Sequence, residues 1–384
     1  MADPACDILF LAGRLGGRDE VRSLRALADR LDRMGHGTRV VCLSALPDHG
    51  LDNLVESPGL GHRWRLGWTA RCLGPGLRPG SGSGSGSEAG RPLVLHVLGA
   101  GMADAGLEVA ERWGLPYVLS VDEFPRPDAR LRISRAWCKA IVATNRELAE
   151  ALTRDFGIPA RSIHTVARGI AEPDRPASPR PPGRVPVIGA AGPLVAGSGF
   201  ATFLNAARRV VDAGVDAEFL IAGQGEDEAD LRRRADRLRI ADRLTFADEL
   251  AVGLTLWDVL DVYCQTSVVP TVGRSLALAL AHGVPSIASD VEGLRALVGE
   301  VEGGVRIPHG DPGALARAIV ALLSDPDHAR AVGEAGRDAA LGDHHPDREA
   351  GRLARIYADL AGAGRTLADS VPAGRVAFES GPEP

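Results

Sequence analysis

Several glycines in this sequence follow runs of apolar residues, at positions where the backbone can approach a bound ligand closely. Gly192 and Gly199 bound one such loop, and Gly273-Arg274-Ser275 opens a later apolar helical pattern. The first backbone N–H groups of a helix have no partner within the helix, so they favour anions such as phosphate. Gly273, Arg274 and Ser275 are therefore candidates to contact an anion at the start of that helix.

Arg274 is the charged member of this set, and it has two interpretations. It either donates to a bound phosphate or is one more solvent-facing arginine in an Arg-rich chain. We favour the second, because helix N-termini attract anions without a side chain. Gly16 and Gly17 belong to a Gly-rich loop after the first apolar run. Their neighbours Arg14 and Arg18 have the same two interpretations as Arg274.

Two further patterns are better explained by structure than by chemistry. The run LGAGMADAG over 98–106 is similar to a dinucleotide fingerprint, but Asp104 replaces its third glycine and would repel a pyrophosphate. Asp104 is more simply an acidic residue in the first turn of a helix. His344-His345 is a possible metal pair without a third ligand nearby, so a solvated surface pair is favoured. We expect no metal site and no cofactor.

Apolar runs alternate with longer amphipathic stretches along the whole chain. This alternation predicts strands that alternate with helices, and therefore parallel sheets. The predicted strands are 7–12, 38–43, 93–98, 117–121, 140–143, 163–166, 187–191, 218–222, 244–247, 262–265 and 286–289. The predicted helices include 21–34, 146–156, 311–323 and 346–362. The run 276–281 has no polar face, which predicts a buried helix.

Two segments interrupt the alternation and divide the chain. The run GSGSGSGS predicts a flexible loop, either native or an engineered linker, and a later run with six prolines predicts a stiff connection. A last helix is expected to pack back on the first domain, before a frayed tail. The first predicted Rossmann-like domain is 1–171, with its flexible loop at 73–92, and the Pro-rich linker is 172–186. The second Rossmann-like domain is 187–345, the last helix 346–364 and the tail 365–384.

Length, charge and cysteine content narrow the class of protein. A chain of 384 residues suits two domains, and a net charge of −6 argues against nonspecific nucleic-acid binding. No apolar run reaches the roughly 18 residues that a spanning helix needs. Five scattered cysteines suit a reducing compartment better than a disulfide framework or a zinc site. We expect a cytoplasmic protein, free or peripheral at the membrane, without a transmembrane segment or a nucleic-acid partner.

Several segments, in order along the chain, resemble the family-4 glycosyltransferases, the retaining GT-B enzymes that take sugar from a nucleotide donor. The nearest matches are FLIAGQGEDEADLRR over 219–233 and ALAHGVPSIASDVEGL over 279–294. GLPYVLSVDE over 114–123 and ARGI over 167–170 are also similar to segments of that family. The resemblance covers about 7–362. It implies an α/β GT-B architecture, two doubly wound Rossmann-like domains facing a cleft, with a nucleotide-sugar donor and a glycan or lipid acceptor.

The two cations with which that family neutralises the donor diphosphate are replaced here. The family pattern GRLxxxKG reads GPLVAGSG over 192–199, so Pro193 stands in place of the Arg and Ser198 in place of the Lys. Gly192 and Gly199 still fit, and the resemblance implies that they line the substrate site together with Gly16 and Gly17 of the opening loop and with Gly273, Arg274 and Ser275. If each lost contact is worth about 1.5–3 kcal/mol, donor affinity falls by about 10²-fold to 10⁴-fold.

The acidic pattern and the cleft histidine of the family are replaced as well. The pattern EGxGxxxxE, whose glutamates bind sugar and ribose hydroxyls, reads PTVGRSLAL over 270–278. Pro270 and Leu278 therefore replace both carboxylates, and Leu278 would place an isobutyl group where a carboxylate would contact ribose. Asp122 stands where many members carry a cleft His. Asp122 is the candidate for that position, and no residue is assigned a catalytic role.

The sequence leaves two functions open. As an enzyme, the chain would transfer a hexose from a UDP- or GDP-sugar to a glycan or lipid, with retention and without a required metal. As a non-enzyme, it would be a pseudo-glycosyltransferase that binds a protein partner or a ligand, for example to regulate a true transferase. The second function is favoured, because the replacements fall on functional positions while the surrounding framework is intact.

Overall fold

The chain folds into two compact α/β units. The computed structural model describes residues 5–15, 18–45, 51, 53–57, 92–126, 130–134, 136–170, 172–173, 181, 183–247, 255–299 and 303–362. Unit 1 comprises Met1–Gly169 and Pro346–Pro384, and unit 2 comprises Ile170–His345. Most of the predicted flexible loop and Pro-rich linker, and all of the predicted tail, lie outside the described residues.

Unit 1 is built on a seven-stranded parallel sheet. In sheet order its strands are β3 (Leu54–Glu56), β2 (Gly37–Ala45), β1 (Asp7–Leu15), β4 (Leu93–Leu98), β5 (Tyr117–Val121), β6 (Cys138–Ala143) and β7 (Ile163–Thr165). The chain proceeds from β1 to one edge and then returns to β4 on the other side of β1. The order of the strands therefore reverses between β1 and β4, which makes this a doubly wound sheet.

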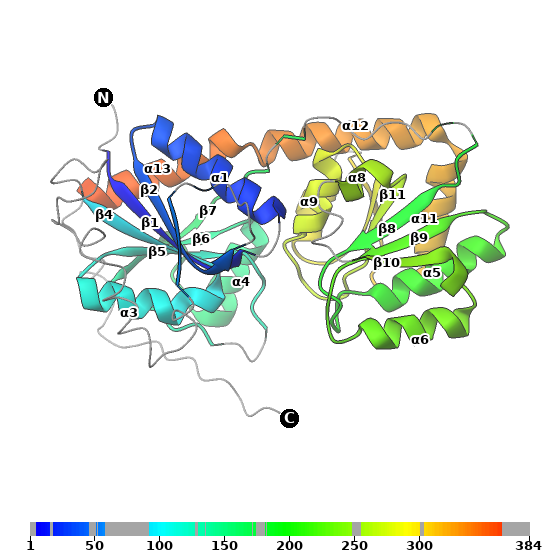
Figure 1. Cartoon of the computed structure of the whole chain (residues 1–384), viewed down its shortest axis with the longest axis horizontal. Coiled ribbons are helices and arrows are strands. Elements are labelled where there is room, and N and C mark those ends of the chain that lie inside the picture. Colours follow the sequence, from blue (N-terminus) through cyan, green and yellow to red (C-terminus); the bar gives the residue numbers. More distant parts are fainter. Residues whose placement is uncertain are drawn as a thin grey trace. The chain divides into compact units, whose positions relative to one another are not determined.

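Helices cover both faces of this sheet (Figure 1). They are α1 (Arg18–Arg33), η3 (Ala100–Met102), α3 (Ala103–Trp113), α4 (Arg146–Phe156), η4 (Ala160–Ser162) and α13 (Pro346–Gly362). Helices α1 and α13 lie side by side on one face. Leu24 and Leu31 of α1 and Leu353 and Tyr357 of α13 share one buried cluster with residues of the sheet. The last helix thus completes the core of unit 1.

Unit 2 is built on a six-stranded parallel sheet. In sheet order its strands are β10 (Leu244–Ala247), β9 (Glu218–Ala222), β8 (Val187–Ala191), β11 (Val262–Gln265), β12 (Ser286–Ser289) and β13 (Val305–Ile307). The order reverses between β8 and β11. At such a switch point the loops from adjacent strands diverge, which opens a site at the carboxyl ends of the strands.

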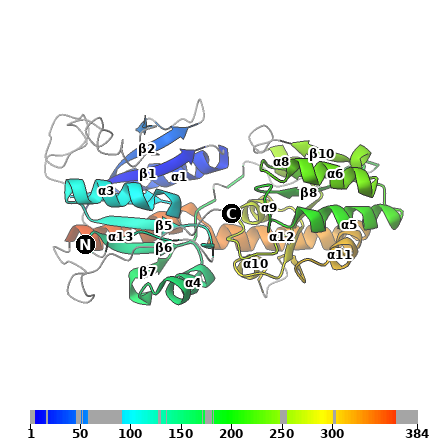
Figure 2. The same cartoon turned by 90° about the horizontal axis from the view of Figure 1, so that it is seen from below.

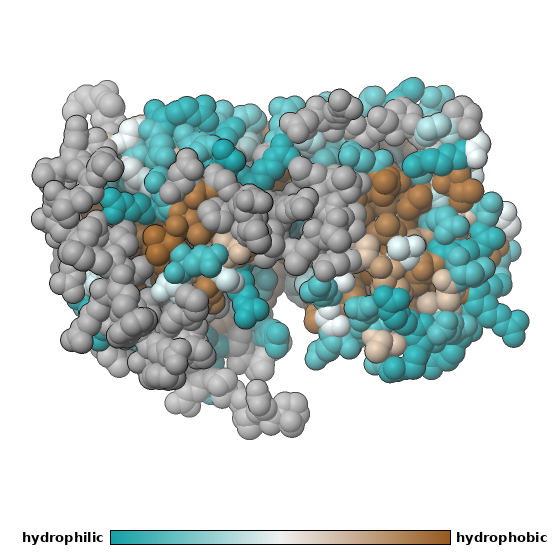
Figure 3. Space-filling model, viewed as in Figure 1, coloured by the Kyte–Doolittle hydropathy of each residue, from teal (hydrophilic) through white to brown (hydrophobic). Residues whose placement is uncertain are grey.

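Helices also cover both faces of the second sheet (Figure 2). They are α5 (Phe200–Asp212), α6 (Glu228–Leu238), η5 (Ala241–Arg243), α8 (Thr255–Val259), α9 (Arg274–Ala281), α10 (Leu294–Val298), α11 (Pro312–Ser324) and α12 (Pro326–Asp343). One buried cluster joins α5, α6 and α11, and another joins α8, α9 and α10. Figure 3 shows hydrophilic surface over the outer side of α6, as expected for an amphipathic helix. The predicted class, two doubly wound Rossmann-like domains, is confirmed.

Candidate functional site

The switch point of unit 2 brings four loops together at the carboxyl edge of the sheet. The loops are 192–199 after β8, 223–227 after β9, 266–273 after β11 and 290–293 after β12. Backbone hydrogen bonds join neighbouring loops: Leu194 N to Gln224 O at 2.9 Å, Val268 N to Gly197 O at 2.9 Å, and Thr271 N to Glu292 O at 3.1 Å. The described part of this edge is therefore a preformed surface.

Three predicted site glycines lie on this edge. Gly192 directly follows β8, Gly199 caps α5, and Gly273 caps α9; all three have a positive φ. A Cβ at Gly199 would lie 1.7 Å from the carbonyl oxygen of Thr266, so only glycine lets these two loops approach. Close packing of the two loops therefore explains why glycine is needed at position 199. The contribution of Gly199 to ligand binding stays a prediction.

Arg274 and Ser275 are the first two residues of α9. Both are half-buried, and Nη2 of Arg274 is buried. Arg274 is therefore not the solvent-facing arginine that we favoured from the sequence. Its position at a helix N-terminus beside the switch point is suitable for contact with an anion.

The residues that the family resemblance aligned with donor-binding charges are neutral, and two of them have local structural contacts. Ser198 Oγ donates a 2.7 Å hydrogen bond to the carbonyl oxygen of Pro193, which closes the loop 192–199 on itself. Leu278 packs against the buried cluster around α9, and Pro270 is exposed. None of these side chains can balance the charge of a phosphate.

The electrostatics of the four loops disfavour an anionic ligand. Together they contain four carboxylates and no Lys, Arg or His. The carboxylates are Glu226, Asp227, Asp290 and Glu292. Arg295 of α10 donates to Asp290 at 2.5 Å, and this hydrogen bond lowers the pKa of Asp290. Arg295 is thus engaged by a carboxylate. Arg274 is the first residue of α9, directly after the loop 266–273.

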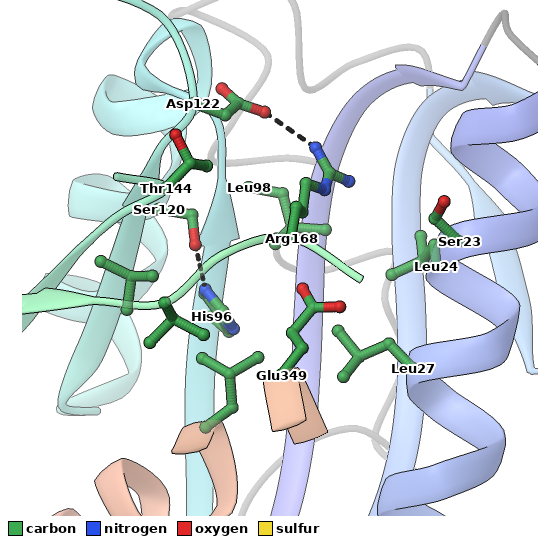
Figure 4. Close-up of a pocket in the computed structure, with 13 residues that line it drawn as sticks. Ser23, Leu24, Leu27, His96, Leu98, Ser120, Asp122, Thr144, Arg168 and Glu349 are labelled. Carbon is green, nitrogen blue, oxygen red and sulfur yellow. Dashed lines mark hydrogen bonds and ion pairs between the residues drawn. The ribbon is translucent and has the colours of Figure 1, made fainter. Parts of the chain in front are cut away.

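Unit 1 has a pocket at the carboxyl ends of its own strands (Figure 4). It lies between the ends of β4 to β7, helix α1 and the first turns of α13. Its polar lining includes Ser23, His96, Ser120, Asp122, Thr144, Arg168 and Glu349. The predicted residue Asp122 belongs to this pocket, whereas Gly16 and Gly17 lie outside the described residues.

Asp122, at the position of the family's cleft histidine, is held in an ion pair. Arg168 Nη1 donates to Asp122 Oδ2 at 2.8 Å, and both side chains are less than a third exposed. The pair connects the end of β5 to the segment after β7 (Figure 4). The charge of Arg168 balances that of the Asp122 carboxylate. Asp122 is therefore suited to hold these two segments together, and its ion pair does not resemble a substitute for a histidine side chain.

A buried hydrogen-bonded chain lies beside this ion pair. Tyr357 OH is 2.5 Å from His96 Nδ1, and His96 Nε2 is 2.7 Å from Ser120 Oγ. The two ring nitrogens of His96 thus each have one hydroxyl partner, and the tautomer of the imidazole sets which group donates in each bond. Burial, and then Arg168, lowers the pKa of His96 to about 3, so His96 does not act as a base at neutral pH.

The stability of unit 1 should depend on pH through His96. The pKa is about 3 in the fold and 6.5 in an ordinary histidine, so the unfolded chain binds a proton that the folded chain excludes. The free energy of unfolding should therefore fall as pH drops through this interval, by up to about 1.4 kcal/mol per pH unit. Urea unfolding at several pH values measures this slope. The His96→Asn variant keeps a neutral donor and acceptor and should show a shallower slope; equal slopes would contradict the assignment.

His96, Ser120, Arg168, Glu349 and Tyr357 were not predicted as site residues. Glu349 is buried and accepts a 2.8 Å hydrogen bond from Gly169 N. This bond connects α13 to Gly169, the last residue of unit 1 before the chain enters unit 2. A histidine inside the apolar run 93–98 was one available signal. The opposite charges of Asp122 and Arg168, each just after a predicted strand, were a second signal in the sequence.

Within the described residues, no three His, Cys, Asp or Glu side chains gather as metal ligands would. No helix in the same residues is both long and apolar enough to cross a bilayer.

Two family descriptions match successive parts of the chain. Residues 21–172 match the family described as Glycosyltransferase Family 4, and residues 185–325 match the family described as Glycosyl transferases group 1. The two matches fall on the two sheets and together cover most of the chain.

Curated relatives match over a part of their length. The phosphatidyl-myo-inositol mannosyltransferase of Mycobacterium leprae is 30% identical over 167 residues, which are 43% of this chain and 44% of the relative. The 2-deoxystreptamine glucosyltransferase of Streptomyces kanamyceticus is 31% identical over 169 residues, 42% of this chain and 43% of the relative. These matches span less than half the length of either relative.

Solved structures share the fold over nearly the whole chain. Anabaena HepE in complex with UDP and glucose has a TM-score of 0.73 at 14% identity, covering 92% of this chain and 100% of that chain. Sucrose-phosphate synthase from Thermosynechococcus elongatus has a TM-score of 0.70 at 17% identity, covering 94% of this chain and 100% of that chain. At these identities the likeness concerns the fold alone.

Proposed function

Since this chain belongs to the family-4 glycosyltransferases, we propose that it is a non-catalytic member, which uses the scaffold to bind a partner instead of transferring sugar. Its relatives include a mannosyltransferase and a glucosyltransferase. The chain keeps the sheet, the switch point and the glycines of such a protein. It has lost the charges with which the family holds a nucleotide-sugar.

One observation carries this proposal: the four loops at the switch point hold four carboxylates and no cation. A sugar-nucleotide brings two negatively charged phosphates, whose charge grows as the glycosidic bond breaks. A transferase must stabilise that charge with preorganised donors or cations. Here the four loops supply no such cation, so binding and turnover are both disfavoured.

Arg274 favours a second candidate function. It is half-buried at the N-terminus of α9, where it and the free N–H groups of the helix are positioned to share one phosphate. An active chain would then transfer a hexose from a UDP- or GDP-sugar to a glycan or lipid, with retention and without a bound cofactor. We rank this second, because one cation would replace two.

Thermal unfolding with nucleotides separates the two candidates. A ligand that binds the folded state raises the melting temperature according to its concentration relative to Kd. We expect no rise with UDP, GDP or their sugars at sub-millimolar concentration, and no hydrolysis or transfer. A rise that Arg274→Ala abolishes, and that Arg330→Ala on the exposed side of α12 leaves intact, would support the transferase instead.

A cytoplasmic location, free or peripheral at a membrane, is part of the proposal. The described cysteines Cys6, Cys42, Cys138 and Cys264 are all buried free thiols. Burial raises the pKa of Cys42 to about 11 and of Cys138 to about 12, so these thiols stay protonated and unreactive. Free thiols of this kind are typical of proteins in reducing compartments.

A further inference from the structure

We infer that the switch-point edge of unit 2 is a docking surface for a basic, apolar segment of a partner protein. This inference rests on the proposed function and names the chemistry of the partner. The surface consists of the same four loops, which expose apolar side chains and carboxylates.

The centre of this surface is apolar and exposed. Val195, Val268 and Val269 are 38%, 37% and 49% exposed, and they account for three of the seven large hydrophobic side chains that are exposed within the described residues. Pro193 and Pro270 beside them are exposed as well. Isolated exposed valines are ordinary, but a group of them on adjoining loops is typical of interaction sites.

The apolar residues lie on two loops in direct contact. Val268 N donates to Gly197 O at 2.9 Å, and a Cβ at Gly197 would lie 3.0 Å from Cγ2 of Val269. The loop with Val195 is also closed by the bond from Ser198 to Pro193. Because these loops are held by their own hydrogen bonds, a partner would find the patch already ordered and would lose little entropy on binding.

Carboxylates flank the apolar centre on both sides. Asp227 N donates to Leu194 O at 3.0 Å, which places the loop with Glu226 and Asp227 beside the first apolar loop. The bond from Thr271 N to Glu292 O places Glu292 beside the second. An apolar centre with an acidic rim is complementary to a segment with apolar and basic side chains, because opposite potentials steer the encounter.

The same charges argue against other occupants. A nucleotide and an anionic membrane surface are both negatively charged, so the carboxylates would repel them. A purely basic peptide would leave the valines exposed to water, and a purely apolar one would bring no opposite charge to Glu226 and Asp227. The surface therefore fits a segment in which lysines or arginines alternate with large apolar residues.

Binding of labelled peptides to the full chain tests the inference. The probe is a short peptide of alternating lysine and leucine, compared by fluorescence anisotropy with a glutamate–leucine and a lysine–serine version. We expect the lysine–leucine peptide to bind most tightly. Val269→Asp and Glu226→Lys should each weaken its binding about tenfold or more, a loss of about 1.4 kcal/mol or more. The matched control Val55→Asp changes an equally exposed valine in unit 1 and should bind normally.

Equal binding of the lysine and glutamate peptides, or equal loss in Val269→Asp and Val55→Asp, would overturn the inference. Circular dichroism checks that each variant is folded, and Glu226→Lys decides the question if Val269→Asp is not. The proposed function has a separate readout. Turnover of a nucleotide-sugar by the unmodified chain would contradict the proposed function, whereas absence of both turnover and peptide binding would contradict this inference alone.

Discussion

A chain that carries both Pro193→Arg and Ser198→Lys should bind UDP or GDP about 10²-fold to 10⁴-fold more tightly than the unmodified chain. The loop that bears these positions still begins at Gly192 and ends at Gly199, which caps α5. Restored cations would therefore project from a framework that fits the family pattern. Each charged hydrogen bond contributes about 1.5–3 kcal/mol, and the two effects together give the expected range.

Isothermal titration calorimetry with each nucleotide measures this gain. The control variant, Pro193→Gln with Ser198→Gln, introduces side chains of similar length without charge and should gain little affinity. A second control adds an arginine and a lysine on the exposed side of α12, where general attraction between opposite charges is the only benefit. If the restored variant is folded and still ignores nucleotides, missing cations do not explain the loss of donor binding.

Gly199→Ala should destabilise unit 2 by roughly 3 kcal/mol or more, because it combines overpacking with backbone strain. The new Cβ would lie 1.7 Å from the carbonyl oxygen of Thr266, and φ is +79°. Neither the backbone of α5 nor that of the loop after β11 can move without breaking contacts at the switch point. Urea unfolding of the variant and the unmodified chain measures the change.

Gly214→Ala provides a matched control for this prediction. Gly214 has a similar φ of +82°, but a Cβ there would meet nothing within 4 Å. Gly214→Ala should therefore lower the free energy of unfolding only by the strain of a left-handed residue, about 1–2 kcal/mol. The difference between the two variants isolates the close approach of the loops. Similar losses in both would mean that the loops separate easily and that the edge is not preformed.

Most strands were predictable from the sequence because they are short apolar runs with clear ends, whereas the three-residue strands β3 and β13 were not predicted. Five strands of unit 2 begin and end where the apolar runs predict, including β8 at Val187–Ala191 and β11 at Val262–Gln265. Helix α4 also matches, since Asn145 caps its start and Gly157 ends it. Local chemistry alone decides these elements.

Helix α12 was missed, and its packing explains why. Its interior contains Gly333 and Gly336, which weaken a helix by about 1 kcal/mol each relative to alanine. A Cβ at Gly333 would lie 2.3 Å from Gly283 O, and one at Gly336 would lie 2.6 Å from Gly303 O. Glycine is needed there because the helix lies directly on other backbone segments. Such a tertiary reason cannot be seen in the local sequence.

The sequence predicted which loops form the site, but it did not predict which side chains contact one another there. The sequence places Gly192, Gly199 and Gly273 after strands, and the switch point brings those strand ends together. It does not show that Arg168 pairs with Asp122, or that Tyr357 reaches His96 across 261 positions of the chain. The first contact depends on how the chain after β5 and the chain after β7 converge, and the second on the exact placement of α13 against β4. No local pattern specifies either one.

The placement of α13 has a consequence for how the protein is made. Unit 1 is assembled from the beginning of the chain and from Pro346 onward, with the whole of unit 2 inserted between them. During synthesis, the first sheet emerges from the ribosome long before Tyr357 and Leu353, which cover one of its faces. That face is left uncovered by these residues while unit 2 is being translated, so the nascent first sheet exposes apolar surface that chaperones can protect.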